Sequence, residues 1–113
     1  MNAGEIYLAS FPFGGSAGVK LRPVLVLTGR IGTVPEVVTA YISSVIPTSL
    51  LQSDLILDPS TPDNRSTNLK TKSVLRLHKV ATLHDRLLSR RLGELSPATQ
   101  LIVNAKLKAM LGL

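Results

Sequence analysis

Val24-Leu25-Val26-Leu27-Thr28 decides the fold class, because a short run of β-favouring apolar residues is typical of a strand buried on both faces. Pro23 precedes this run. A second long β pattern, Glu36–Ile46, is ended by Pro47. Shorter patterns predict further strands at residues 4–10, 54–58 and 72–80, and a last short strand or extended piece at residues 90–95. The chain is therefore expected to be mostly β.

The segments between these strands are rich in residues that favour turns. Phe11–Lys20 holds three glycines and a proline, so we predict a loop there. Pro59–Asn68 is rich in Pro, Ser, Thr, Asp and Asn and is predicted to be a mobile loop. Leu83–Ser89 is predicted to form one or two turns of helix. Short strands broken by such loops indicate a small, partly open antiparallel barrel or sandwich.

One helix is predicted at the C-terminal end. Ser96-Pro97 is a strong helix start, because the serine hydroxyl can cap a free amide and proline at the first helical position has no amide to satisfy. The helix is expected to run to about Leu111 and to pack one apolar face on the sheet. The residues expected on that face are Leu101, Ile102, Ala105, Ala109 and Met110.

Size and composition indicate one domain, residues 1–113, since 44% of the residues are hydrophobic and can form an adequate core. The absence of cysteine excludes disulfides, a thiolate nucleophile, cysteine-type zinc sites and iron–sulfur clusters. Met1–Glu5 lacks the pattern of a secretory signal, and the longest apolar run is far shorter than the roughly 20 residues of a membrane span. We therefore expect a cytoplasmic protein without a membrane partner.

Charge gives the first indication of a partner. The net charge is +6, and it is uneven: residues 1–64 have a balance of −2, whereas residues 65–113 have a balance of +8. Such a field concentrates polyanions, so nucleic acid or an acidic protein segment is the expected partner, although excess charge can also serve solubility alone.

The common metal and cofactor motifs are absent from the sequence, so we expect no cofactor. RNA can be cut through its own 2′-hydroxyl by a protein that provides only a proton acceptor, positive donors for the phosphorane and a proton source. Arginine, histidine and a hydroxyl can supply all three. Since DNA has no such internal nucleophile, a nuclease of this composition would favour RNA.

The order of motifs resembles the MazF/PemK family of toxin endoribonucleases. The resemblance rests on Gly4-Glu5-Ile6-Tyr7-Leu8, Lys20-Leu21-Arg22-Pro23-Val24-Leu25-Val26-Leu27 and Ser73-Val74-Leu75-Arg76-Leu77, together with Thr82 and Arg86-Leu87. It implies an SH3-like antiparallel barrel of the CcdB/MazF/PemK kind with a C-terminal helix. It further implies a homodimer, a metal-independent cut that leaves a 2′,3′-cyclic phosphate and a 5′-hydroxyl, and a cognate antitoxin with which the toxin binds DNA.

The resemblance also implies site residues in the first half of the chain. Arg22 matches the family's arginine before proline, which stabilises the phosphate, although an arginine that caps a strand needs no such role. Ser43 aligns with the active-site threonine and keeps its hydroxyl, with Ser44 as the substitute if the register slips. A polar residue that ends a strand is also common without any function.

Arg76 and His78 match the positions of the Arg-x-Asp pair of the Kid/PemK branch, so the second position departs from the pattern. Strand alternation predicts that the two side chains point the same way, about 6 to 7 Å apart. Histidine has an ordinary pKa near 6.5, which suits a general base at neutral pH. His78 could instead stack on RNA or be a plain surface residue.

Three further cations are predicted to bind RNA: Lys20, Lys79 and Arg86. Arg90 and Arg91 are expected either to guide the RNA backbone or to form surface ion pairs. Several family members have an arginine where this chain has Ala81, so one phosphate contact is expected to be missing. His84 and Asp85 are expected in a solvated turn.

The predicted function is a sequence-selective, ribosome-independent messenger RNA endonuclease of a type II toxin–antitoxin pair, with single-stranded RNA in the groove of the dimer. A disordered, acidic antitoxin tail would occupy that groove and inhibit by occlusion. Two alternatives remain open. One is a catalytically silent relative that binds RNA or antitoxin, and the other is a CcdB-like DNA gyrase poison, which the absence of a tryptophan-ended tail disfavours.

Overall fold

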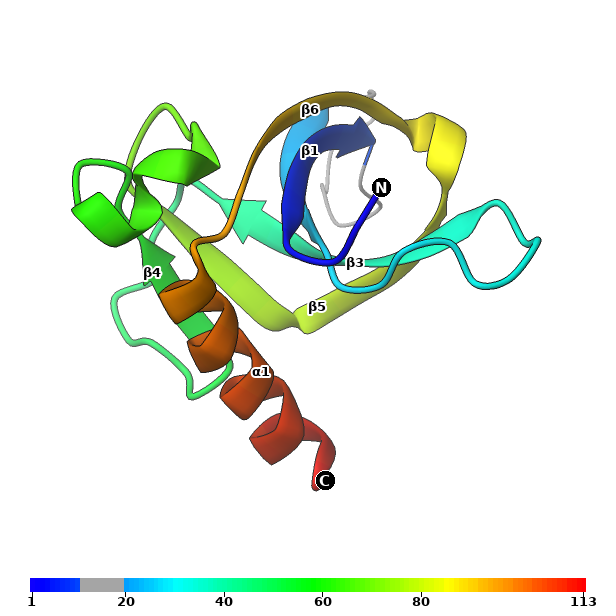
Figure 1. Ribbon diagram of the computed structural model, residues 1–113. Helices are drawn as coiled ribbons and strands as arrows, with labels where there is room; N and C mark the ends of the chain where they lie inside the picture. Colours follow the sequence, from blue (N-terminus) through cyan, green and yellow to red (C-terminus); the bar gives the residue numbers. More distant parts are fainter. Residues whose placement is uncertain (11–19) are drawn as a thin grey trace.

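Six antiparallel strands form one curled sheet in the order β4-β5-β3-β2-β1-β6 (Figure 1). The computed structural model describes residues 1–10 and 20–113. The strands are β1 (Glu5–Ser10), β2 (Leu21–Val26), β3 (Glu36–Ser43), β4 (Asp54–Leu57), β5 (Ser73–His84) and β6 (Leu88–Glu94). The mostly-β prediction is confirmed. The sheet curls like a barrel but stays open, because β4 and β6 are edge strands. Most of the first predicted loop lies outside the described residues.

The sheet carries a hydrophobic core on each face. One core includes Ile6, Leu25 and Leu75, and it is covered by Val103 of the C-terminal helix α1 (Pro97–Leu111). The other core lies inside the curl and includes Val24, Val26, Val37 and Leu83. Val24, Leu25 and Val26 are completely buried, as expected for a strand covered on both faces.

β3 is shorter than its sequence pattern predicts. It ends at Ser43 rather than Ile46, and the Val45 amide donates a hydrogen bond to Ser43 Oγ over 3.1 Å. The serine side chain therefore satisfies the backbone in a turn and competes with continued strand pairing.

The prediction for Pro59–Asn68 is also wrong, because Pro62–Thr67 forms a 3₁₀ helix, η1. Short side chains hold it locally: Thr67 is buried and its Oγ1 donates to Asn64 O over 2.7 Å, while Asn68 adopts a left-handed φ of 54°. The residues that favour turns therefore form a compact, hydrogen-bonded segment here rather than a mobile loop.

The helix predicted at Leu83–Ser89 is largely strand. β5 continues to His84, which pairs with Glu36 of β3, and only the short 3₁₀ turn η2 (Asp85–Leu87) is helical. Pairing along β3 supplies the hydrogen bonds that override the local helix preference.

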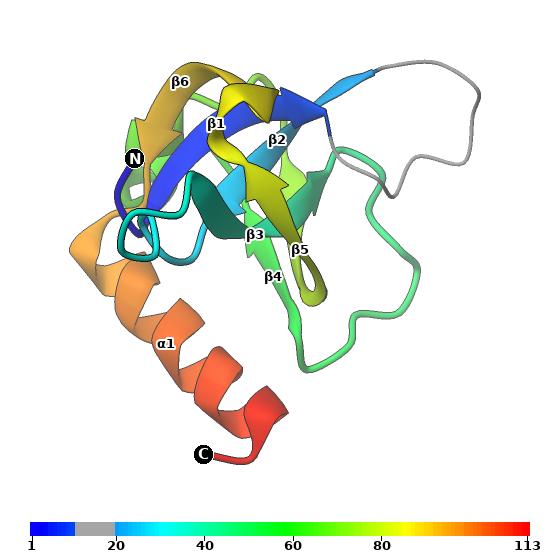
Figure 2. The same ribbon diagram turned by 90° about the vertical axis from the view of Figure 1, so that its right-hand side faces the viewer.

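α1 begins as predicted, with Ser96 Oγ accepting a hydrogen bond from the Thr99 amide, but it presents a different face to the sheet. Thr99 and Val103 are buried, whereas Leu101 is 70% exposed. Ile102 and Met110 of the predicted stripe are exposed too. The reason is visible in Figure 2, where the C-terminal half of α1 extends away from the sheet. Among the described residues, no helix is long and apolar enough to cross a membrane.

Gly93 of β6 is a close-approach position, and Gly93→Ala is expected to destabilise the fold by about 3 kcal/mol. A Cβ there would lie 2.7 Å from Thr67 O and closer still to the Ser66 carbonyl, so backbone would have to shift. Gly32→Ala is the matched control: its φ is +61°, but nothing lies within 4 Å, so about 1 kcal/mol of backbone strain is expected. Urea unfolding of both variants measures the difference, and equal losses would contradict this account.

Candidate active site

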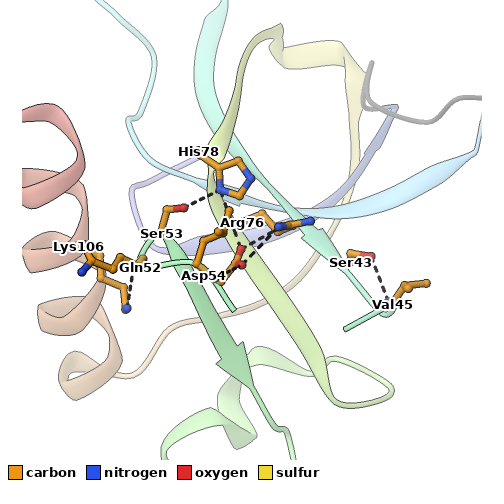
Figure 3. A network of polar contacts seen from close by, with 9 residues as sticks. Ser43, Val45, Gln52, Ser53, Asp54, Arg76, His78 and Lys106 are labelled. Atoms are coloured by element: carbon orange, nitrogen blue, oxygen red, sulfur yellow. Dashed lines mark hydrogen bonds and ion pairs between the residues drawn. The ribbon is translucent and has the colours of Figure 1, made fainter. Parts of the chain in front are cut away.

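A polar cluster lies where β4 meets β5, and it contains Ser53, Asp54, Arg76 and His78 (Figure 3). Arg76 Nε donates to Asp54 Oδ1 over 2.9 Å, and Arg76 Nη2 approaches Oδ2 at 3.4 Å. His78 Nδ1 lies 2.7 Å from Ser53 Oγ and 4.0 Å from Asp54 Oδ1. Arg76 and His78, predicted to act together, are thus brought to one carboxylate.

Strand register and a bulge build this cluster. Asp54 pairs directly with Arg76, so their side chains share a face of the sheet. The pairing of β3 with β5 shifts between Arg76 and Val80, and the extra residues form a bulge that contains His78. The Leu77 amide donates to Ser53 O within it over 3.0 Å. Bulges commonly re-aim side chains in this way, and here the bulge brings the imidazole to Ser53.

Asp54 is fully buried yet charged. Burial alone would raise its pKa, but hydrogen bonds from the Leu51 amide (2.9 Å) and from Arg76, with the positive charge of that guanidinium, outweigh it. The pKa of Asp54 therefore lies below its usual value. The carboxylate orients the Arg76 guanidinium through its hydrogen bond, and it lies 4.0 Å from His78 Nδ1.

Ser43 lies at the end of β3, where its hydroxyl accepts the Val45 amide hydrogen bond. It pairs with Val74, which is two residues before Arg76 on the same strand. Because side chains alternate along a strand, Ser43 lies on the same face of the sheet as Arg76. The two residues are one strand apart and are offset by two residues along the strand direction. The donor proton of its hydroxyl can therefore serve a bound phosphate near the cluster.

Arg22 and Ser44 lie away from the cluster, where they line a cavity of about 390 Å³ at the end of the sheet. The Arg22 Nε is shielded from solvent and has no hydrogen-bond partner in the described part of the chain. Val24 of β2 pairs with Tyr41 of β3, and Tyr41 pairs with Arg76 of β5. Arg22 therefore lies two strands away from Arg76 and two residues further toward the end of the sheet, which corresponds to about 12 Å between their Cα atoms. The structure therefore brings Arg76 and His78 together and leaves Arg22 at a neighbouring position.

The other predicted cations surround the sheet. Lys20 and Arg86 are exposed, and Lys79 Nζ lies 5.6 Å from the centroid of the Tyr41 ring, within the range of a cation–π contact. Arg91 forms an ion pair with Glu5 at 2.6 Å. The hydrogen bond from Arg91 lowers the pKa of the Glu5 carboxyl, so this arginine is a surface ion-pair partner, one of the two roles expected of it.

The sequence matches the family model of the PemK-like, MazF-like toxin of type II toxin–antitoxin systems over residues 2–111. The chain belongs to this family. No curated protein matches the chain by sequence.

Solved structures of MazF toxins share this fold. An endoribonuclease in complex with its cognate antitoxin from a mycobacterial species is 22% identical, with a TM-score of 0.74 over 100% of this chain and 96% of that one. The Mycobacterium tuberculosis toxin MazF-mt6 is 21% identical, with a TM-score of 0.74 over 96% and 97%. MazF from Deinococcus radiodurans is 20% identical, with a TM-score of 0.71 over 100% and 97%.

The cluster differs from the Arg-x-Asp pattern of the Kid/PemK branch in where its carboxylate comes from. His78 stands where the pattern has its carboxylate, and Asp54 supplies a carboxylate to Arg76 from the neighbouring strand instead. Sequence reasoning missed Asp54. The sequence does contain an indication of its role, because Asp54 is an acidic residue at the start of the otherwise apolar strand Asp54-Leu55-Ile56-Leu57. A charge that is buried in such a strand needs a partner of opposite charge.

Proposed function

We propose that this PemK/MazF toxin is an endoribonuclease that cleaves messenger RNA sequence-selectively, without the ribosome and without a metal ion. The observation that carries the proposal is the placement of Arg76 and His78 around the buried Asp54 carboxylate. Support also comes from similar structures that are themselves endoribonucleases, and from the positive balance of residues 65–113.

The reaction would begin when His78 removes the 2′-hydroxyl proton. For Nε2 to accept this proton, Nδ1 must carry the other one and donate it to Ser53 Oγ, which lies 2.7 Å away. The 2′-oxygen then attacks phosphorus, and the bond from phosphorus to the 5′-oxygen breaks. The products are a 2′,3′-cyclic phosphate and a 5′-hydroxyl, with water as the proton source for the leaving oxygen.

The charges of the cluster suit this sequence of steps. Arg76, oriented by Asp54, would stabilise the phosphorane, and Asp54, 4.0 Å from Nδ1, would stabilise the imidazolium that forms. Ser43 would hold the phosphate through its hydroxyl. Arg22 would neutralise charge on the same strand of RNA from its neighbouring position.

The partners we infer are single-stranded messenger RNA, a second copy of the chain and an acidic antitoxin, all in the cytoplasm. RNA would lie in the groove between the two copies, where Lys20, Lys79 and Arg86 add salt-sensitive contacts and Ser44 adds a neutral hydroxyl. An acidic antitoxin tail would compete for the same positive groove, and the toxin with its antitoxin would bind DNA. Two of the similar structures are complexes with antitoxins.

The proposal is tested by incubating the purified protein with a long RNA in excess EDTA and mapping the 5′ ends of the fragments. We expect cuts at a short recurrent sequence, 5′-hydroxyl ends, and a loss of about 100-fold or more in rate for His78→Ala. His78→Gln keeps a polar side chain without a base and should be as slow. Tight RNA binding without cuts would instead support a silent binding module, which the departures at Ser43, His78 and Ala81 favour.

A further inference from the structure

The segment between β3 and β4 is held from two sides at Ser53, the residue whose hydroxyl contacts His78 (Figure 3). On one side, the Ser53 carbonyl accepts a hydrogen bond from the Leu77 amide of β5 over 3.0 Å. On the other side, Lys106 Nζ of α1 donates to the Gln52 carbonyl over 2.9 Å. These two carbonyls belong to the peptide groups on either side of the Ser53 Cα. Because the backbone has only two soft dihedral angles per residue, the two hydrogen bonds together restrain both angles of Ser53.

Lys106 reaches the Gln52 carbonyl across a cavity. The cavity has a volume of about 460 Å³, and it lies between the Gln52–Ser53 peptide and a helical wall formed by Ala105, Ala109, Met110 and Lys106 itself. Alanine side chains are too short to fill this space, whereas the long side chain of Lys106 spans it. Lys106 is half-buried, and among the described residues it forms no ion pair. A hydrogen bond from an ionised donor is stronger than one between neutral groups, so the ammonium group holds the peptide firmly.

The direction of the hydrogen bond between Ser53 and His78 follows from the nearest charge. Asp54 Oδ1 lies 4.0 Å from His78 Nδ1. A negative charge beside one ring nitrogen favours the tautomer that has its proton on that nitrogen. Nδ1 therefore donates to Ser53 Oγ over 2.7 Å, and Nε2 is the ring nitrogen that can accept a proton. If Ser53 Oγ moves away, the imidazole loses the acceptor that fixes its orientation and its tautomer.

We propose that Lys106 is a positioning residue for His78, on which it acts through the Gln52–Ser53 peptide. The ammonium group holds the peptide, the peptide places Ser53 Oγ, and Oγ fixes the imidazole. This inference rests on the proposed function, because it takes His78 as the general base. It extends the cleavage site to α1, a helix that supplies none of the residues assigned to the reaction above.

Lys106→Met removes the ammonium group and keeps a long side chain, and we expect it to lower the single-turnover cleavage rate about 5- to 10-fold, because small displacements of a general base are costly. The Kd for a 2′-O-methyl copy of the cleaved RNA, which cannot react, should be unchanged. Lys106→Arg keeps the charge and the donors and should restore most of the rate. Lys108→Met removes the same charge from an exposed position of α1 and is the matched control, with the wild-type rate. A Lys106→Met protein that binds RNA more weakly but cleaves bound RNA at the wild-type rate would make Lys106 a phosphate contact and overturn the proposal.

A second measurement observes the imidazole directly and needs no cleavage. The chain has two histidines, so ¹⁵N NMR at about pH 8.5, where an ordinary imidazole is neutral, can report the tautomer of each. His84 Nδ1 accepts a backbone amide hydrogen bond, so His84 carries its proton on Nε2, whereas His78 should carry it on Nδ1. In Lys106→Met and Ser53→Ala, the His78 signals should move toward the average of the two tautomers. In Lys108→Met they should stay at the wild-type positions.

The two measurements separate this inference from the proposed function. If the wild type cleaves RNA and Lys106→Met matches Lys108→Met in rate and in the His78 signals, the role of Lys106 is wrong and the nuclease proposal stands. A slower Lys106→Met protein with unchanged His78 signals would also overturn the route through Ser53. If the wild type never cleaves RNA while Lys106→Met still shifts the His78 signals, the nuclease proposal fails and the positioning of the imidazole by Lys106 stands.

Discussion

Arg76→Ala is expected to lower the rate of RNA cleavage by about 100- to 1000-fold. The guanidinium is held by Asp54 through Nε and, at longer range, Nη2, so its remaining donors are oriented before the substrate arrives. Oriented charges of this kind stabilise the transition state without reorganisation, and loss of one such donor typically costs this much. The measurement is a single-turnover cleavage rate on an RNA that contains the mapped site.

A drop in rate must be separated from a loss of folding, because Arg76→Ala leaves the buried Asp54 without its guanidinium partner. Arg76→Lys keeps a positive charge near Asp54 but loses the planar fork, so it should fold and still be slow. Arg65→Ala removes an exposed arginine of η1 and should cleave normally. Full activity in folded Arg76→Ala protein would remove Arg76 from the mechanism.

The strands of this fold could be predicted because their signals are local. Alternation and β-favouring residues located all six strands, and Ser96-Pro97 located the start of α1. The apolar face of α1 could not be predicted, because its sequence spacing fits more than one stripe and only the angle of the helix on the sheet selects Val103 over Leu101. The 3₁₀ helix at Pro62–Thr67 depends on side-chain hydrogen bonds that composition does not reveal.

The candidate site could be predicted only in its local part. The pair Arg76 and His78 lies on one strand, so alternation and family resemblance together located it. Asp54 is 22 residues earlier, and its contact with Arg76 depends on the register of β4 against β5 and on the bulge at His78. Neither can be read from one sequence, because register is fixed by packing of the whole sheet.

Asp54→Asn is expected to reduce the free energy of unfolding by about 2–3 kcal/mol at pH 7. The change keeps the shape but replaces a charged acceptor of hydrogen bonds from Leu51 and Arg76 with a neutral one, and it leaves the Arg76 charge without its partner. Cleavage should slow as well, since this carboxylate orients Arg76 through a hydrogen bond and lies 4.0 Å from His78 Nδ1. Urea unfolding at pH 7 measures the stability, with Asp63→Asn as a control at an exposed acid of η1.

The stability difference between wild type and Asp54→Asn should depend on pH in a defined direction. The pKa of Asp54 is lower in the folded protein than the ordinary value of about 3.9, so ionised Asp54 stabilises the fold fully above about pH 5. As the pH falls below about 4, Asp54 takes up a proton in the unfolded chain before it does so in the folded protein. The stabilisation by ionised Asp54 therefore decreases, and it is fully lost once the folded carboxyl is protonated too. The two proteins should therefore approach equal stability at low pH, whereas Asp63→Asn should show no comparable change. A stability difference that is as large at pH 3 as at pH 7 would mean that the shape of the Asp54 side chain, rather than its charge, provides the stabilisation.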